Sequence, residues 1–147
     1  MERESRFEFL ARTVLRVEPD ELCMQEVGDG LERFCQDYLK GRYPFVVVAP
    51  GNDPRGLALA VLSRQPLTEV CTHADWEFPR ADGTRTSRFS RDLLRVELSQ
   101  GWLILNAHIK SRRGGPPADL QRYSDAMAVR QLLDGLREIP IVGDVRG

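Results

Sequence analysis

Residues 43–63, YPFVVVAPGNDPRGLALAVLS, decide the fold of this chain. Two apolar runs, 43–50 and 56–63, have the length and composition of buried β-strands. The residues that join them, GNDPRG, are almost all turn formers, because glycine tolerates positive φ, proline fixes φ, and Asn and Asp bind nearby backbone. The stretch therefore predicts an antiparallel hairpin.

Similar patterns continue on both sides of this hairpin. Helical periodicity predicts helices, and short apolar runs bounded by turn residues predict strands. The other expected elements are helices at 5–18, 29–40 and 118–137 and strands at 22–27, 67–73, 93–99, 102–108 and 139–144. This order predicts an α/β fold of the α+β type, with a mixed, largely antiparallel sheet and helices on one face.

The size and composition are those of one soluble globular domain spanning residues 1–147, with 41% apolar and 29% charged residues. No apolar run reaches the roughly 18 residues of a membrane-spanning helix. The amino terminus, MERESRFEF, is charged and lacks the apolar stretch of a signal peptide, so we expect a cytoplasmic protein. Three cysteines without a CxxC pair indicate reduced, mostly buried thiols rather than a zinc site.

Nearly all of the 21 basic residues are arginine, and several of these gather between positions 80 and 95. Arginine suits phosphate because its guanidinium is a planar fork of donors. Codon bias explains heavy arginine usage equally well, and we favour that simpler interpretation. The net charge of −1 does not suit a protein that coats nucleic acid over its whole surface.

Polar side chains stand at the ends of three expected strands: Glu26, the pair Asn106 and His108, and Asp144. A carboxylate such as Glu26 could ligate Mg²⁺, which prefers oxygen ligands. A histidine could donate to a phosphoryl oxygen or protonate a leaving group, and an aspartate could orient or deprotonate a water. Each signal alone fits a solvated strand end or a hydrogen-bonded rim residue better than a catalytic residue, so their joint occurrence carries the argument.

Four segments of the chain resemble the endonuclease/exonuclease/phosphatase superfamily, which includes deoxyribonuclease-like enzymes. The likeness covers residues 5 to 144. The segments are EPDELCMQEV at 18–27, RGLALAVLSRQPL at 55–67, FSRDLLRVELSQGWLILNAHIKS at 89–111 and IPIVGDVRG at 139–147.

The resemblance implies a divalent-metal-dependent hydrolase of phosphoester bonds, in which water attacks phosphorus in line with the leaving group. On the matching positions, Glu26 would bind Mg²⁺ or Mn²⁺, and His108 and Asp144 would be catalytic. Arg91 and Asn106 would bind the substrate phosphate. The substrate class stays open among DNA, RNA, small phosphoesters and lipid head groups.

The chain also departs from the superfamily pattern. We expect it to lack the first strand, which ends in an asparagine, and the C-terminal half, which supplies a closing Asp-His pair. Arg146 stands where the motif has a second asparagine. These differences favour a weakly held metal and an impaired site.

Half of a four-layer αββα sandwich would leave an apolar sheet face uncovered, so we expect a homodimer through that face. The alternative to an enzyme is a catalytically inactive relative that acts as a binding or oligomerisation module, with nucleic acid among its ligands. A truncated reading frame without a role of its own is the third interpretation.

Overall fold

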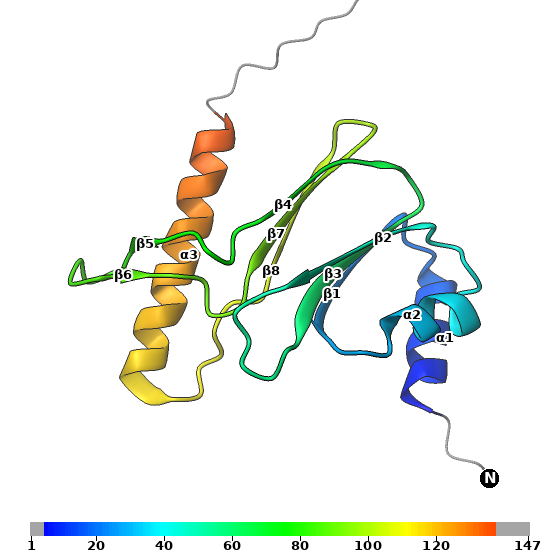
Figure 1. Cartoon of the computed structure of the whole chain (residues 1–147), viewed down its shortest axis with the longest axis horizontal. Helices are drawn as coiled ribbons and strands as arrows, with labels where there is room; N and C mark the ends of the chain where they lie inside the picture. Colours follow the sequence, from blue (N-terminus) through cyan, green and yellow to red (C-terminus); the bar gives the residue numbers. More distant parts are fainter. Residues whose placement is uncertain (1–4, 138–147) are drawn as a thin grey trace, which may run out of the picture. The chain divides into compact units, whose positions relative to one another are not determined.

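The computed structural model describes residues 5–137, which form two compact units (Figure 1). The first unit contains the chain up to Ala74 together with Arg91–His108. The second contains Asp75–Ser90 and the described residues 109–137. The expected strand at 139–144 lies outside the described residues, and the prediction of a single domain stays a prediction.

The hairpin at 43–63 forms as expected, as strands β2 (Phe45–Pro50) and β3 (Ala58–Ser63). Strand β1 (Glu21–Val27) pairs antiparallel with the other edge of β3, so the sheet has the order β1-β3-β2. All six residues of β3 are buried. A strand covered on both faces reads as a continuous apolar run, which explains why this stretch dominates the sequence.

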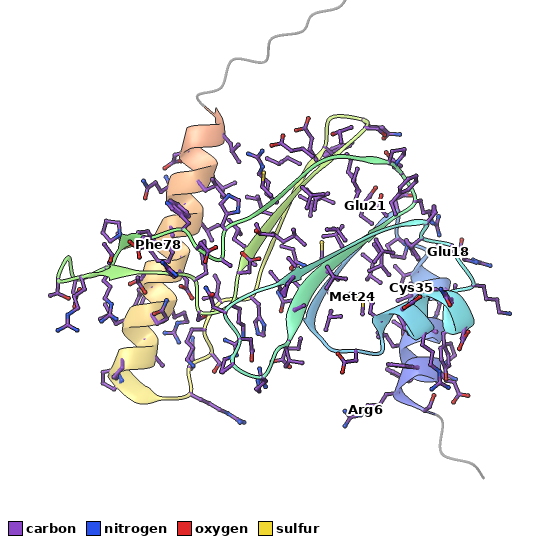
Figure 2. All side chains as sticks on the ribbon, in the orientation of Figure 1. Arg6, Glu18, Glu21, Met24, Cys35 and Phe78 are labelled. Carbon is purple, nitrogen blue, oxygen red and sulfur yellow. The ribbon has the colours of Figure 1, made fainter. Side chains whose placement is uncertain are left out.

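One face of the first sheet is covered by helices. Helix α1 (Arg6–Val17) begins at a capping box in which Ser5 and Glu8 bind each other's backbone N–H groups. The expected helix at 29–40 is a short α-helix, α2 (Leu31–Arg33), followed by a π-helical turn, η1 (Phe34–Tyr38). Their apolar side chains pack on Ala60 and Leu62, and Met24 and Cys35 join this core from β1 and η1 (Figure 2).

A second antiparallel sheet covers the opposite face. It consists of β4 (Leu67–Thr72), β7 (Leu93–Leu98) and β8 (Leu103–Ala107), in the order β4-β7-β8. Leu59 and Val61 of β3 pack against Leu94 and Val96 of β7 in one buried cluster. This second sheet covers the face that we expected to be uncovered. On the other face of the first sheet, Val46 and Val48 of β2 are 42% and 47% exposed, and the homodimer stays a prediction.

The α+β fold class is confirmed, with the sheet divided into two layers that face each other. Sequence patterns identify strands but do not say which strands pair, since β4 pairs with β7 and not with its predecessor β3. Each helix and strand that the sequence predicted within residues 5–137 is present.

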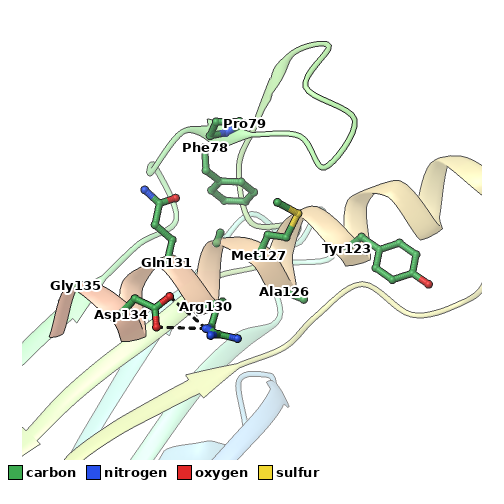
Figure 3. A pocket seen from close by; sticks show the side chains of 10 residues that line it. Phe78, Pro79, Tyr123, Ala126, Met127, Arg130, Gln131, Asp134 and Gly135 are labelled. Atoms are coloured by element: carbon green, nitrogen blue, oxygen red, sulfur yellow. Dashed lines mark hydrogen bonds and ion pairs between the residues drawn. The ribbon is translucent and has the colours of Figure 1, made fainter. Parts of the chain in front are cut away.

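The second unit contains a short strand pair, β5 (Phe78–Pro79) and β6 (Thr86–Ser87), and helix α3 (Gly115–Arg137). The sequence pattern does not indicate this strand pair, since each strand has only two residues. A groove of about 750 Å³ lies along α3 beside Phe78, and an Arg130–Asp134 ion pair flanks it (Figure 3).

No helix within the described residues is long and apolar enough to cross a membrane. The cysteines are free thiols, but the expectation that they are mostly buried is wrong, because Cys23 is exposed and Cys35 and Cys71 are half-buried. Burial still raises the pKa of Cys23 and of Cys35 above the ordinary value for a thiol.

Candidate functional site

The site is built around an irregularity in β1. The pairing of β1 with β3 is regular up to Met24 and resumes at Val27 with a shifted register, so a bulge lies between them. Within this bulge Glu26 has φ +54°, a left-handed conformation that a non-glycine residue rarely adopts. Bulges commonly re-aim a side chain next to a functional site, and this one turns Glu26 out of the strand alternation.

Two amides tie the bulge to the second sheet. Asn106 of β8 donates from Nδ2 to the carbonyl oxygens of Met24 and Ala60, each at 3.0 Å. Gln25 donates from Nε2 to the carbonyl oxygen of Ala107 at 2.7 Å. Asn106 is only 4% exposed, so its donors satisfy backbone acceptors that an irregular ladder would otherwise leave without partners.

A tight turn between β2 and β3 carries the cationic part of the site. The N–H of Gly56 donates to the carbonyl oxygen of Asp53 at 2.9 Å, which closes a β-turn with Pro54 at its second position. The Asp53 side chain is 1% exposed and accepts from the backbone N–H, Nε and Nη2 of Arg55 at 2.8, 3.1 and 2.9 Å. These bonds hold the pKa of the Asp53 carboxyl well below its ordinary value.

Arg91 reaches the same carboxylate from the start of β7. Its Nε lies 3.2 Å from Oδ2 of Asp53, and its side chain is 17% exposed. The backbone of Asn52 donates to the carbonyl oxygen of Arg91 at 2.6 Å. This approach requires Gly51, because a Cβ there would lie 2.3 Å from the Arg91 carbonyl oxygen. The geometry brings two guanidinium groups onto one buried carboxylate.

Arg55 also joins this cluster to the bulge. Its Nη2 lies 3.2 Å from Oε1 of Glu26, and both side chains are about half exposed. The hydrogen bonds to Asp53, and then that to Glu26, raise the pKa of the Arg55 guanidinium above its ordinary value. Glu26, Arg55, Asp53 and Arg91 thus form a continuous chain of alternating charges.

His108 follows β8 directly and is half-buried beside these charges. Burial first, and then the positive charge of Arg91, lower the pKa of its imidazole below the ordinary 6.5. The negative charges of Glu26 and Asp53 raise the pKa of His108, and the positive charge of Arg55 lowers it. The balance leaves the imidazole neutral at pH 7, with one N–H donor and one acceptor nitrogen.

The described residues do not by themselves fit a divalent metal. Among residues 5–137, no group of three or more His, Cys, Asp or Glu side chains could hold a metal ion. Glu26 is the single carboxylate that the resemblance assigns to the metal in this part of the chain, and a guanidinium already contacts it. A hard cation gains little from one carboxylate that is already paired.

The structure brings together most of the residues that the sequence singled out. Glu26 and Arg91 both act electrostatically on His108. Asn106 is buried, its Nδ2 donates to two backbone carbonyl oxygens, and its role in phosphate binding stays a prediction. Asp144 lies outside the described residues.

Asp53 and Arg55 were missed by the sequence analysis. Their signal was present in the hairpin itself, because Asp-Pro-Arg-Gly is a turn sequence and its aspartate binds the backbone two residues on. What the sequence did not indicate was that the arginine would reach Glu26, 29 positions earlier in the chain.

Comparison with known proteins identifies the fold. No family model and no curated protein matches the sequence. The crystal structure of truncated Caenorhabditis elegans TDP2 matches with a TM-score of 0.60 and 22% sequence identity. The match covers 92% of this chain and 50% of that one, so the present chain spans about half the length of TDP2 as crystallised. At this identity the likeness concerns the fold.

Proposed function

We propose that the chain is a phosphoester hydrolase of the endonuclease/exonuclease/phosphatase superfamily. Support comes from the four sequence segments and from the fold that the chain shares with TDP2. The observation that carries the proposal is the cluster at the end of the two sheets, where Arg55 pairs with Glu26, Arg91 pairs with Asp53, and the charges of all four act on His108. Guanidinium groups and an imidazole N–H are donors that suit phosphoryl oxygens.

Each residue has a defined part in this proposal. Arg91 donates to a phosphoryl oxygen of the substrate while Asp53 holds its Nε end. His108 donates its N–H to a second phosphoryl oxygen. Its lowered pKa favours the neutral imidazole, which still carries one N–H donor. Water then attacks phosphorus as the bond to the leaving oxygen breaks, and Asp144, a catalytic position by resemblance, is our candidate to orient that water or accept its proton. The dependence on Mg²⁺ or Mn²⁺ stays a prediction.

The test is hydrolysis of bis(p-nitrophenyl) phosphate with and without Mg²⁺ or Mn²⁺. His108→Ala should lower kcat about 10²- to 10³-fold, the cost of removing one donor aimed at developing charge. His73→Ala is the matched control, since His73 is the other histidine of the chain and binds the Leu93 carbonyl oxygen through Nδ1. Equal activity of the wild type and His108→Ala would remove His108 from the mechanism.

The second candidate function is an inactive relative that binds phosphate-bearing ligands. The Arg55–Glu26 ion pair favours this second function, because the arginine neutralises the carboxylate that the resemblance assigns to the metal. Binding of a single-stranded oligonucleotide with a steep salt dependence, and no turnover under any metal condition, would support this alternative over the hydrolase.

A further inference from the structure

Arg55 is held in place independently of Glu26. The turn that carries it is closed by the Asp53 carbonyl oxygen, and Pro54 fixes φ at its second position. The guanidinium then forms a forked pair with both carboxylate oxygens of Asp53. The Asp53 side chain is 1% exposed, so this carboxylate is shielded from solvent. The guanidinium of Arg55 therefore keeps its position whether or not it contacts Glu26.

Glu26 is held in place independently of Arg55. Its backbone lies in the bulge of β1, which Asn106 and Gln25 bind to β8. The contact at 3.2 Å between Nη2 of Arg55 and Oε1 of Glu26 therefore joins a guanidinium that Asp53 holds to a side chain whose backbone is held by the bulge. The rotamer freedom lost in forming a surface ion pair is then limited mainly to the Glu26 side chain.

The charges explain what this contact does. A divalent ion at Glu26 would have to share the carboxylate with the guanidinium at Oε1 or displace it, and in either case it would remain close to a positive charge that Asp53 keeps in place. The described part of the chain offers no group of three or more metal-ligating side chains to offset that repulsion.

We infer that the guanidinium of Arg55 takes the place of a divalent cation at Glu26, so that the site presents fixed positive charge to a phosphoryl ligand without a metal on this carboxylate. The inference rests on the proposed function for the choice of Glu26 as the carboxylate that a metal would use. The inference adds Arg55 to the proposed site, as the residue that decides whether a divalent metal can bind at Glu26.

Mn²⁺ binding tests the inference without any turnover. The free Mn²⁺ signal in electron paramagnetic resonance is followed as the protein is titrated, for the wild type, Arg55→Gln and the double variant Arg55→Gln/Glu26→Gln. We expect Arg55→Gln to bind one Mn²⁺ at least about fivefold more tightly than the wild type, since a half-exposed ion pair and a nearby positive charge are removed together. The double variant should lose this gain.

Arg42→Gln is the matched control. It removes an arginine that pairs with Glu18 at 3.0 Å and is similarly exposed, on a part of the first unit that carries none of the site residues. Its Mn²⁺ affinity should equal that of the wild type. Thermal unfolding of all variants, followed by circular dichroism, checks that each is folded before titration.

Two results would overturn the inference. One is an Arg55→Gln variant whose Mn²⁺ affinity equals that of the wild type; if that shared affinity is high and is lost in the double variant, Glu26 is an ordinary metal ligand and the proposed hydrolase stays intact. The other is a gain of affinity in Arg55→Gln that the double variant keeps, which would place the added Mn²⁺ away from Glu26. Failure of the proposed function looks different, since it is an absence of phosphodiester hydrolysis whatever the Mn²⁺ titrations give.

Discussion

Replacing Asn106 by alanine should destabilise the first unit strongly. The Nδ2 group donates to two backbone carbonyl oxygens, those of Met24 and Ala60, each at 3.0 Å, and the residue is 4% exposed. A buried polar group left without its partner costs about 1–3 kcal/mol. For two acceptors, we therefore expect the free energy of unfolding to fall by about 2–6 kcal/mol, a large part of the 5–15 kcal/mol typical of a domain.

Urea unfolding followed by far-ultraviolet circular dichroism measures this loss. Thr68→Ala is the matched control, because Thr68 also bonds a backbone carbonyl oxygen, that of Glu97 at 3.3 Å, but in an exposed position. Its effect should stay within about 0.5 kcal/mol, as for most surface substitutions. If Asn106→Ala costs less than about 1 kcal/mol, the two carbonyl groups do not depend on this amide, and the account of how the bulge is held is wrong.

Three further predictions concern packing, burial and protonation. Gly51→Ala should cost about 2 kcal/mol or more in urea unfolding, since its Cβ would lie 2.3 Å from the Arg91 carbonyl oxygen, whereas Gly28→Ala meets its nearest atom at 3.9 Å and should be tolerated. Asp125→Ala should cost the protein about 2–4 kcal/mol by the same measurement, because the fully buried carboxylate accepts three hydrogen bonds in the second unit. The imidazole of His108 should titrate below pH 6.5 by nuclear magnetic resonance, and Arg91→Gln should raise that midpoint. Stability should fall as the pH drops below about 6.5, because the unfolded chain binds this proton first.

Much of the fold could be predicted because its strands are strongly apolar. The hairpin of β2 and β3 is bounded by turn residues, and β3 is buried along its whole length. Strands β5 and β6 could not be predicted, since each has two residues and no alternating pattern. The division into two sheets also escaped prediction, because periodicity locates a strand but does not choose its partner.

The site was predictable only where a residue's role follows from its position at a strand end. Glu26 and His108 meet this condition, and the charge of Glu26 acts on His108 in the structure. Asn106 follows the same rule in the sequence, yet its amide satisfies a bulge that the alternation of β1 does not indicate. Arg55 could not be assigned, since its contact with Glu26 depends on how β1 and the turn before β3 meet in space.

The connection between β4 and β7 has a consequence for engineering. The two strands are antiparallel neighbours, and Thr72 lies opposite Leu94. Residues 75–90, which belong to the second unit, therefore leave the first unit and return to it at adjacent positions. In topological terms this segment is an insertion in a β-hairpin, and insertions with adjacent ends are well tolerated. The exposed tip of this segment, residues 82–85 between β5 and β6, can thus be lengthened by grafting while β4 and β7 keep their register.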